Sequence, residues 1–318
     1  MRKFIKEILS FLVRYSGLHL VISNTYAKNK VAIILYHDIT RDKLQQHLGY
    51  LSKYYNFITL DLLVQAIHEE SWKDIPSKSL VITFDDGHRG NFQLLEVLKK
   101  YEVTPTSYLC SHLINSNRKF WWNVCKEEQI YLLKTYSNGE RLLLLGQWYN
   151  YTPVKQYPDQ ERETLSLDEL VAMQDYVDFQ SHSCYHPILT SCSDEECQQE
   201  IFESGKEIER ITGKAVKHFS FPNGNYSQRE IDLIKEAGYR SARTTELGWN
   251  DLTTDPYKLK IVGIADNSST NFLAMQLSGI THIIWRILNR FFGGLVSVLV
   301  LTAPYPDLQV PFLNTVFG

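Results

Sequence analysis

The chain has 318 residues and a formal net charge of −3, with 33 lysines and arginines against 36 aspartates and glutamates. Hydrophobic residues make up 44% of the sequence and charged residues 22%, a balance that supports a large buried core and excludes a disordered or collagen-like chain. Since no excess of basic residues is present to neutralise a phosphate backbone, nucleic acid is excluded as an expected partner.

The N-terminal segment and the cysteines bear on where the protein works. Five cysteines without a C-x-x-C pair argue against a disulfide framework or a zinc ribbon and favour a reducing compartment. Lys6, Glu7 and Arg14 interrupt the apolar stretch that a signal peptide would need. We therefore expect residues 1–30 to form an amphipathic helix that lies on the domain or on a membrane surface. The expected location is the cytoplasm, with membrane association as an open alternative.

From residue 31 onward, short β-like runs alternate with helical patterns, as in folds that wind strands and helices around a parallel sheet. The predicted strands cover residues 31–36, 57–60, 80–84, 104–109, 177–181, 218–221, 240–243 and 259–264. One helix is predicted over residues 91–101, and two more begin at the S-x-x-E capping boxes of Ser193 and Ser227. The pattern predicts an α/β fold, a (β/α) barrel over residues 31–270.

Two segments depart from this alternation. The segment from about residue 111 to 166, after the fourth strand, is rich in Trp and Tyr and too long for an ordinary loop, so we expect an aromatic insertion near one rim. The tail over residues 271–318 becomes apolar at about residue 280, but Arg286, Arg290 and two glycines leave the apolar run too short to span a membrane. We expect this tail to pack on the barrel or to lie on a membrane, and a true membrane span is the less favoured alternative.

The strongest chemical signal is the run from Thr83 to Gly87, in which an apolar strand ends in two aspartates and a glycine. Adjacent strand residues point to opposite faces, so only a bend at the strand end brings Asp85 and Asp86 into one site, and Gly87 permits that bend. Two like charges there favour a bound cation. Taken alone, however, the motif is explained more simply as a solvated Asp-Gly turn.

A second strand end carries His182 and His186, and Pro187 disfavours helical geometry at His186. We expect a turn from strand to loop in which both imidazoles converge from one rim. Two histidines and a carboxylate at strand ends fit an open divalent metal site in which water takes the remaining positions.

Two further strand ends carry candidate residues. The turn Pro222-Asn223-Gly224 can present backbone N–H groups to an anionic intermediate, although a plain β-turn explains it equally well. The first strand ends in Tyr36 and His37. Barrel enzymes place their active sites at the carboxyl ends of their strands, so we expect all these residues at one rim.

Together these motifs resemble those of the polysaccharide deacetylase family, carbohydrate esterase family 4, whose barrel is the NodB-homology domain. Residues 83–87 match its T-F-D-D-G motif, residues 182–187 match H-S/T-x-x-H-P, and residues 221–224 stand where its P-x-G motif should. The start at Tyr36-His37 is similar to one branch of the family. The resemblance covers about residues 31–265 and implies a distorted (β/α) barrel that removes N-acetyl groups from a glycan with the help of a divalent metal.

The resemblance also implies roles for individual residues. It implies three metal ligands: Asp86, His182 and His186. The metal would be zinc first, with cobalt, nickel or manganese as alternatives. Asp85 would take the proton from a metal-bound water that attacks the amide carbonyl, and the N–H of Asn223, between Pro222 and Gly224, would help to hold the oxyanion.

Three departures from the family pattern affect these roles. Ser220 stands where many members have the arginine that orients the catalytic aspartate, so Lys260 or Arg243 is expected to supply the charge. Asn223 replaces a common tyrosine. No Leu-x-His motif late in the barrel supplies a general acid, so His37 is the substitute candidate.

Three functions stay open at this point: an N-deacetylase acting on a polysaccharide, cell-surface or lipid-linked saccharide, a deacylase or esterase removing another acyl group from a saccharide, and a silent barrel that binds carbohydrate. The complete Asp-Asp-His-His set favours activity, because a binding module has no need of a base beside a metal site. The aromatic insertion either offers stacking surfaces to sugar rings or forms its own core. Peripheral membrane contact through both termini would suit a lipid-linked or membrane-proximal glycan.

Overall fold

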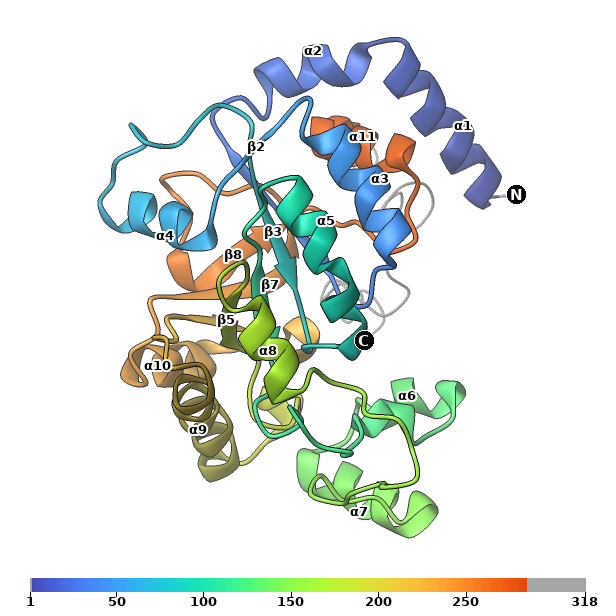
Figure 1. Cartoon of the computed structure of the whole chain (residues 1–318), viewed down its shortest axis with the longest axis vertical. Coiled ribbons are helices and arrows are strands. Elements are labelled where there is room, and N and C mark those ends of the chain that lie inside the picture. The colour runs from blue at the N-terminus through green and yellow to red at the C-terminus, as the bar shows by residue number, and fades with distance from the viewer. Residues whose placement is uncertain (1, 285–318) are drawn as a thin grey trace, which may run out of the picture.

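A sheet of eight strands, all paired in parallel, forms the centre of the part of the chain that the structure, a computed structural model, describes, residues 2–284 (Figure 1). Seven strands follow one another in the order β1, β3, β4, β5, β6, β7, β8, and β2 pairs with the side of β3. The bounds are β1 (Val31–Tyr36), β2 (Asn56–Phe57), β3 (Ser79–Phe84), β4 (Thr106–Leu109), β5 (Asp178–Ser181), β6 (His218–Ser220), β7 (Ser241–Leu247) and β8 (Leu259–Ile261).

The sheet is nearly closed into a barrel. A parallel bridge pairs Ile34 of β1 with Val262, directly after β8, and the Val262 N–H donates to the Ile33 carbonyl oxygen at 2.8 Å. Since the first and last strands meet along this short seam, the carboxyl ends of the strands surround one rim. The predicted distorted (β/α) barrel is confirmed, with β2 beside the ring of seven strands rather than within it.

Helices surround the barrel and extend it at both ends of the molecule (Figure 1). Those that accompany the barrel strands are α3 (Arg41–Leu51), α4 (Leu60–His68), α5 (Leu95–Lys100), α8 (Leu167–Met173), α9 (Asp194–Thr212), α10 (Gln228–Glu236) and α11 (Thr270–Ser278). Before the barrel come α1 (Arg2–Tyr15) and α2 (Leu18–Thr25), at one end. Between β4 and α8, the aromatic segment contributes α6 (Glu127–Leu133) and α7 (Asn138–Tyr149), which project at the opposite end.

The alternation of side chains along the strands explains the core. Every residue of β1 and of β3 is buried, as expected for parallel strands covered on both faces. In β1, Ala32, Ile34 and Tyr36 belong to a hydrophobic cluster with residues of α3 and α5, whereas the residues between them belong to another cluster with residues of α4. This period of two is the packing that the apolar runs predict.

One predicted strand is largely wrong. The sequence predicts a strand over residues 57–60, but β2 ends at Phe57 and α4 begins at Leu60. Thr59 caps this helix, because its side chain accepts a hydrogen bond from the Leu62 N–H. The other strands lie where they were predicted, with ends displaced by a few residues.

The predicted helices agree more closely with the structure. Residues 91–101, predicted as one helix, form a 3-10 turn over Arg89–Leu94 that continues as α5. The capping boxes of Ser193 and Ser227 are confirmed at the starts of α9 and α10. Each serine side chain accepts from a backbone N–H of the first turn, and the glutamate side chain three residues later accepts from the serine N–H.

The chain ends bear on the membrane hypothesis. No helix within residues 2–284 is long and apolar enough to cross a membrane. The apolar tail predicted over 271–318 begins inside α11, whose residues 272–278 are buried, so this first part of the tail packs on the barrel. The rest of the tail, with Arg286 and Arg290, lies outside the described residues.

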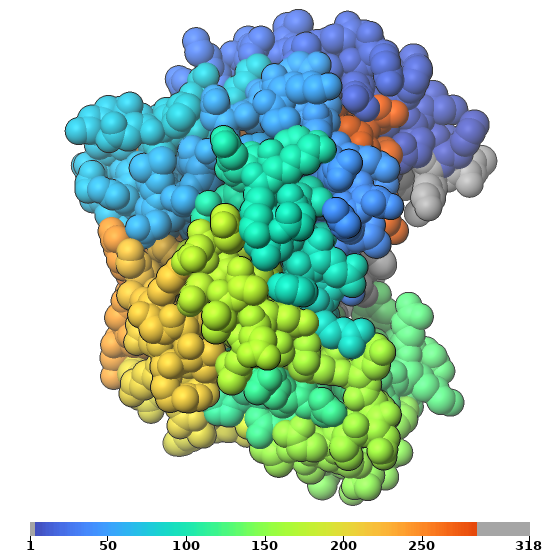
Figure 2. All heavy atoms as spheres, in the orientation of Figure 1, coloured from blue at the N-terminus to red at the C-terminus, as the bar shows by residue number. Residues whose placement is uncertain are grey.

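In helix α1, Lys6 and Arg14 contact the protein, whereas most of the large apolar side chains are exposed. The Lys6 ammonium lies 3.4 Å from the centre of the Phe272 ring of α11, and Arg14 donates to the Asn271 side chain at 2.8 Å. The large apolar side chains that are between 41% and 70% exposed are Phe4, Ile5, Ile8, Leu9, Phe11, Leu12 and Tyr15. In the space-filling view α1 and α2 occupy one edge of the molecule, far from the insertion (Figure 2).

Candidate active site

The candidate site lies at the carboxyl ends of β3 and β5, where backbone hydrogen bonding to the neighbouring strand continues one residue past each strand. The Asp85 N–H donates to the Tyr36 carbonyl oxygen at 2.9 Å, and the His182 N–H donates to the Leu109 carbonyl oxygen at 2.9 Å. These bonds fix the backbone at the points where the functional side chains begin. Both strand ends therefore present their functional side chains at the same rim, as predicted.

Left-handed backbone then turns the side chains inward. Asp86 has φ 70° and Gly87 has φ 68°, so the chain bends at the strand end and both aspartates enter one site. A side chain at Gly87 would place its Cβ 2.7 Å from a Leu109 methyl carbon, which requires glycine there. His186, before Pro187, has φ 57°, in agreement with the predicted non-helical turn.

Asp86, His182 and His186 form a compact cluster. The Nε2 atoms of His182 and His186 lie 3.5 Å and 3.3 Å from Asp86 Oδ1, and one donor atom from each residue lies within 4.8 Å of the other two. Asp86 Oδ1 is buried, and within the described chain no hydrogen bond reaches it. One carboxylate oxygen and two ring nitrogens around a common point fit a divalent cation with positions left for water.

The protonation states also suit metal binding. Burial lowers the pKa of His186 to about 3, so its imidazole is neutral and offers a lone pair. For Asp86, burial raises the pKa of the carboxyl, but the neighbouring histidines outweigh burial and hold that pKa well below its usual range. Neutral imidazole and ionised carboxylate are the forms that metal ligands require.

Hydrogen bonds orient two of the candidate ligands. The Ser220 carbonyl oxygen accepts from His182 Nδ1 at 2.8 Å, which leaves Nε2 for a metal. His88 Nε2 donates to Asp86 Oδ2 at 3.1 Å, which leaves Oδ1 for the histidines and a metal. Sequence analysis missed His88, although its position directly after the T-F-D-D-G motif was an available signal.

Asp85 is anchored by Arg243 and Ser220. The Arg243 guanidinium, from β7, donates to Asp85 Oδ2 and also to the Ser220 hydroxyl oxygen at 2.5 Å. All three side chains are buried. Of the two residues proposed to replace the family arginine, Arg243 therefore reaches the aspartate, whereas the Lys260 side chain lies beside Gly248.

The small side chain at position 220 makes this arrangement feasible. Ser220 of β6 and Arg243 of β7 are direct partners in the sheet, so the guanidinium passes over the serine from the neighbouring strand. Asp85 Oδ1 is buried, and among residues 2–284 it has no hydrogen-bond partner. One oxygen of Asp85 is thus fixed while the other can accept a proton.

Substitutions at Arg243 and Ser220 test whether the Arg243 guanidinium holds Asp85 in place. Arg243→Ser is expected to lower kcat by about 10–100-fold, the usual effect of losing a residue that orients a reactive group, with metal content unchanged. The double variant Ser220→Arg/Arg243→Ser moves the guanidinium from β7 to β6, where the resemblance to the family places an arginine. It should recover part of the lost kcat. Steady-state kinetics and elemental analysis check both variants. Turnover of Arg243→Ser within twofold of the parent would remove the anchoring role.

His37 lies at the rim after β1. Its N–H and that of Asp38 donate to the Asp266 carboxylate at 3.2 Å and 2.8 Å, and its carbonyl oxygen accepts from the Asn91 amide at 2.8 Å. These bonds fix the backbone of His37 at the carboxyl rim. The general-acid role of its imidazole stays a prediction.

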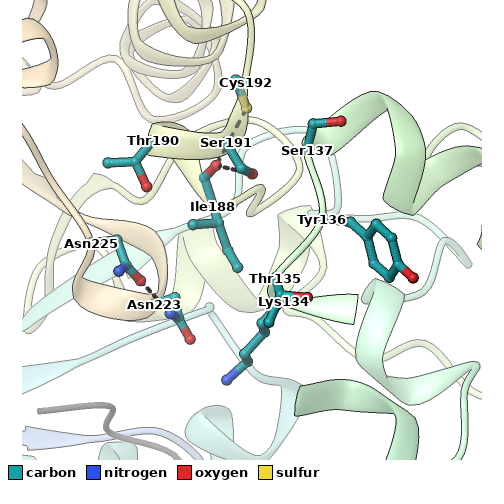
Figure 3. Close-up of a pocket in the computed structure, with 10 residues that line it drawn as sticks. All are labelled: Lys134, Thr135, Tyr136, Ser137, Ile188, Thr190, Ser191, Cys192, Asn223 and Asn225. Atoms are coloured by element: carbon teal, nitrogen blue, oxygen red, sulfur yellow. Dashed lines mark hydrogen bonds between the residues drawn. The ribbon is translucent and has the colours of Figure 1, made fainter. Parts of the chain in front are cut away.

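The Pro222–Gly224 turn follows β6 at the same rim as a short 3-10 turn. Asn223 has φ 58°, and a Cβ at Gly224 would collide with the Thr245 side chain. A cavity of 410 Å³ lies between this turn, the loop after β5 and the insertion (Figure 3). Its lining is Lys134, Thr135, Tyr136, Ser137, Ile188, Thr190, Ser191, Cys192, Asn223 and Asn225.

The aromatic insertion forms a core of its own and also one wall of the site. Its buried cluster contains Trp121, Leu133, Leu145 and Tyr151. The half-buried Trp122 stands edge-on to His186, with ring centres 4.6 Å apart, and Phe120 lies 5.4 Å from His88. The insertion therefore forms its own core, as one of the two expectations states, whereas stacking of its aromatic rings on a sugar stays a prediction.

The fold and the site define an α/β-barrel enzyme scaffold with a candidate metal centre at its carboxyl rim. Residues 73–242 match the family model of polysaccharide deacetylase, and this match includes both aspartates and both histidines of the cluster. The chain belongs to the polysaccharide deacetylase family, as its motifs predicted. The likeness of Tyr36-His37 to one branch of the family stays a prediction.

Known relatives agree with this assignment. The chain is 22% identical over 167 residues to the peptidoglycan-N-acetylmuramic acid deacetylase PdaA of Bacillus subtilis, a match covering 52% of this chain and 45% of that protein. It is 21% identical over 249 residues to YxkH of the same bacterium, covering 76% and 73% of the two chains. The fold is similar to that of the Streptococcus pyogenes deacetylase PplD, solved in complex with acetate, with TM-score 0.59, 17% identity and coverage of 79% and 99%. The chain thus spans less than half of PdaA.

Proposed function

We propose that this protein is a hydrolase that removes N-acetyl groups from a glycan, using a divalent metal, zinc first, held by Asp86, His182 and His186. The observation that carries the proposal is the anchored carboxylate beside the candidate metal centre. Asp85 Oδ2 lies 3.7 Å from His182 Nε2 and accepts a hydrogen bond from the Arg243 guanidinium. A base next to a metal site serves hydrolysis and has no use in a protein that only binds sugar.

The chain's own residues would divide the reaction as follows. A divalent cation at the centre supplies polarisation of the amide carbonyl and a lowered pKa for water. Asp85 takes the water proton on Oδ1 as the water oxygen bonds to the carbonyl carbon, and the Asn223 N–H stabilises the oxyanion. The C–N bond then breaks, His37 protonates the leaving amine, and acetate and a free amino sugar remain.

Acetate release from N-acetylated oligosaccharides, both free and lipid-linked, tests the proposal. We expect acetate and a new amino group in equal amounts, and none with a chelator present. Release from O-acetylated substrates alone would support a saccharide esterase instead. Metal-dependent sugar binding without any release would support the silent carbohydrate-binding barrel.

The cavity of Figure 3 is proposed as a saccharide subsite, because hydroxyl and amide groups line it next to the Pro222–Gly224 turn. Trp122 would stack on the sugar carrying the acetyl group, beside His186. Such aromatic contacts are worth about 0.5–1.5 kcal/mol, so Trp122→Ala is expected to raise KM roughly 2- to 12-fold. Trp148→Ala, at a 45% exposed position of the same insertion, is the matched control. Equal KM values for both variants, with metal content unchanged, would contradict the stacking role.

We also propose that α1 rests on a membrane surface near a lipid-linked or cell-envelope glycan. Its Lys6 and Arg14 side chains contact α11, and most of its large apolar side chains are exposed, the orientation that suits an interfacial helix. A cytoplasmic location with membrane association remains part of this proposal.

Vesicle binding tests the membrane contact. Co-sedimentation with anionic vesicles in low salt is expected for the full chain and should fall at least tenfold for Phe4→Asp/Leu12→Asp, because two charges on the apolar side oppose burial in the headgroup region. Leu143→Asp, at a 61% exposed position in the insertion, is the control. Binding that survives the double substitution but disappears on deletion of residues 280–318 would move the contact from α1 to the tail.

A further inference from the structure

A second cluster of metal-binding side chains lies beside the site described above. It consists of His112, Cys184 and Glu203, whose donor atoms all lie within 4.8 Å of one another. The three residues come from the turn after β4, the loop after β5 and helix α9. None of them has a role in the proposed deacetylation.

Backbone hydrogen bonds hold the imidazole next to the thiol. The Ser111 N–H donates to the Ser183 carbonyl oxygen and the His112 N–H donates to the Cys184 carbonyl oxygen, both at 3.1 Å. The Ser111 hydroxyl lies 3.0 Å from His112 Nδ1 and restrains the ring. These backbone hydrogen bonds therefore fix the position of His112 relative to Cys184.

Helix α9 supplies the third side chain on a fixed face. The Glu200 carboxylate accepts from the N–H groups of Cys184 and Tyr185 at 2.8 Å and 3.0 Å, which ties the helix to the loop. Glu203 follows three residues later and lies on the same face of the helix. Cys184 is buried, His112 is half-buried and Glu203 is exposed, so the cluster opens to solvent on its carboxylate side.

The donor set selects the class of ion. A thiolate with an imidazole suits Zn²⁺ and related transition metals, whereas Mg²⁺ and Ca²⁺ prefer oxygen ligands alone. Three protein ligands of these types leave one tetrahedral position for water. The thiol would release its proton to solvent as the sulfur–metal bond forms.

We propose that His112, Cys184 and Glu203 form a second site for a transition-metal ion such as Zn²⁺ or Co²⁺. Cys184 stands between His182 and His186, so one short loop carries ligands of both sites. The contrasting explanation is purely structural, with His112 packed against Tyr185 at a ring separation of 4.9 Å and Cys184 filling space.

Titration of the chelator-treated full chain with Co²⁺ distinguishes these explanations. We expect two equivalents to bind, one of them with a near-ultraviolet charge-transfer band from thiolate to cobalt, which the Asp86–His182–His186 set cannot give because it holds no sulfur. Cys184→Ser should lose the band and one equivalent. Glu203→Gln, at an exposed position, should weaken the binding of that second Co²⁺ ion at least about tenfold. Cys125→Ser, at a half-buried thiol of the insertion, is the matched control and should keep both equivalents.

His186→Ala separates this site from the deacetylase centre, because it should lose acetate release but keep the thiolate band. Absence of a thiolate band from the parent protein at saturating Co²⁺ would overturn the second site. A band that persists in Cys184→Ser, or an affinity unchanged in Glu203→Gln, would overturn this ligand set.

Discussion

Asp86→Asn is expected to abolish metal binding and acetate release together while the barrel stays folded. The substitution keeps the shape of the side chain but replaces the one anionic ligand with a neutral amide. Asp86 Oδ1 is the oxygen to which both histidine Nε2 atoms are closest, at 3.5 Å and 3.3 Å. Loss of a direct ligand should lower the metal affinity by more than the 10–100-fold that is typical when a residue supporting a ligand is lost.

Elemental analysis after dialysis, acetate release and thermal unfolding followed by circular dichroism check this result. His182→Ala and His186→Ala are expected to give the same outcome, because each removes one of three protein ligands. Asp175→Asn, which removes an exposed carboxylate between α8 and β5, is the control and should match the parent protein. Full metal occupancy in all three site variants would contradict the ligand assignment.

The cluster could be predicted because its information is local. A strand end, a glycine that permits positive φ and a proline after His186 decide where Asp86 and His186 point, and all three are visible in short stretches of sequence. His88 was missed for a different reason. Its position directly after the motif is visible in the sequence, but its role depends on a hydrogen bond back to Asp86, which the motif does not specify.

The anchor of Asp85 could be narrowed only to two residues. Arg243 stands 158 positions away in the sequence, and its contact with Asp85 depends on the register between β6 and β7. The resemblance to the family implies that a positive charge is missing at Ser220, but it does not say which strand provides the replacement. Lys260, the other candidate, differs from Arg243 by its place in the barrel and not by any local signal.

The N-terminal helix shows a further limit of hydrophobic periodicity. The pattern predicts one amphipathic helix over residues 1–30, but the structure has two, α1 and α2, because the chain turns at Gly17, whose φ is 75°. The pattern also does not specify what covers the apolar side of α1. Here the contacts of Lys6 and Arg14 with α11 decide the orientation, and these depend on the fold of a segment 257 residues further along the chain. The strand predicted over residues 57–60 failed similarly, because a cap at Thr59 outweighed the β-like composition.

Asp85→Asn is expected to separate turnover from metal binding. An amide cannot take a proton from water, so we expect acetate release to fall about 10²–10⁴-fold, the usual contribution of a general base, while metal content stays at the level of the parent protein. The asparagine oxygen still accepts from the Arg243 guanidinium, which keeps the geometry. This outcome differs from that of Asp86→Asn, in which metal and turnover disappear together.

Stability measurements complete the test, because Asp85→Asn leaves the Arg243 guanidinium buried, at 1% exposure, without its counter-charge. Removing one partner of a buried ion pair typically costs about 3–5 kcal/mol in the free energy of unfolding. The double variant Asp85→Asn/Arg243→Met removes both charges and should recover most of that loss without recovering turnover. Denaturant unfolding and acetate release are measured on the same preparations. If Asp85→Asn keeps turnover within tenfold of the parent protein, another group accepts the proton and Asp85 serves only to neutralise Arg243.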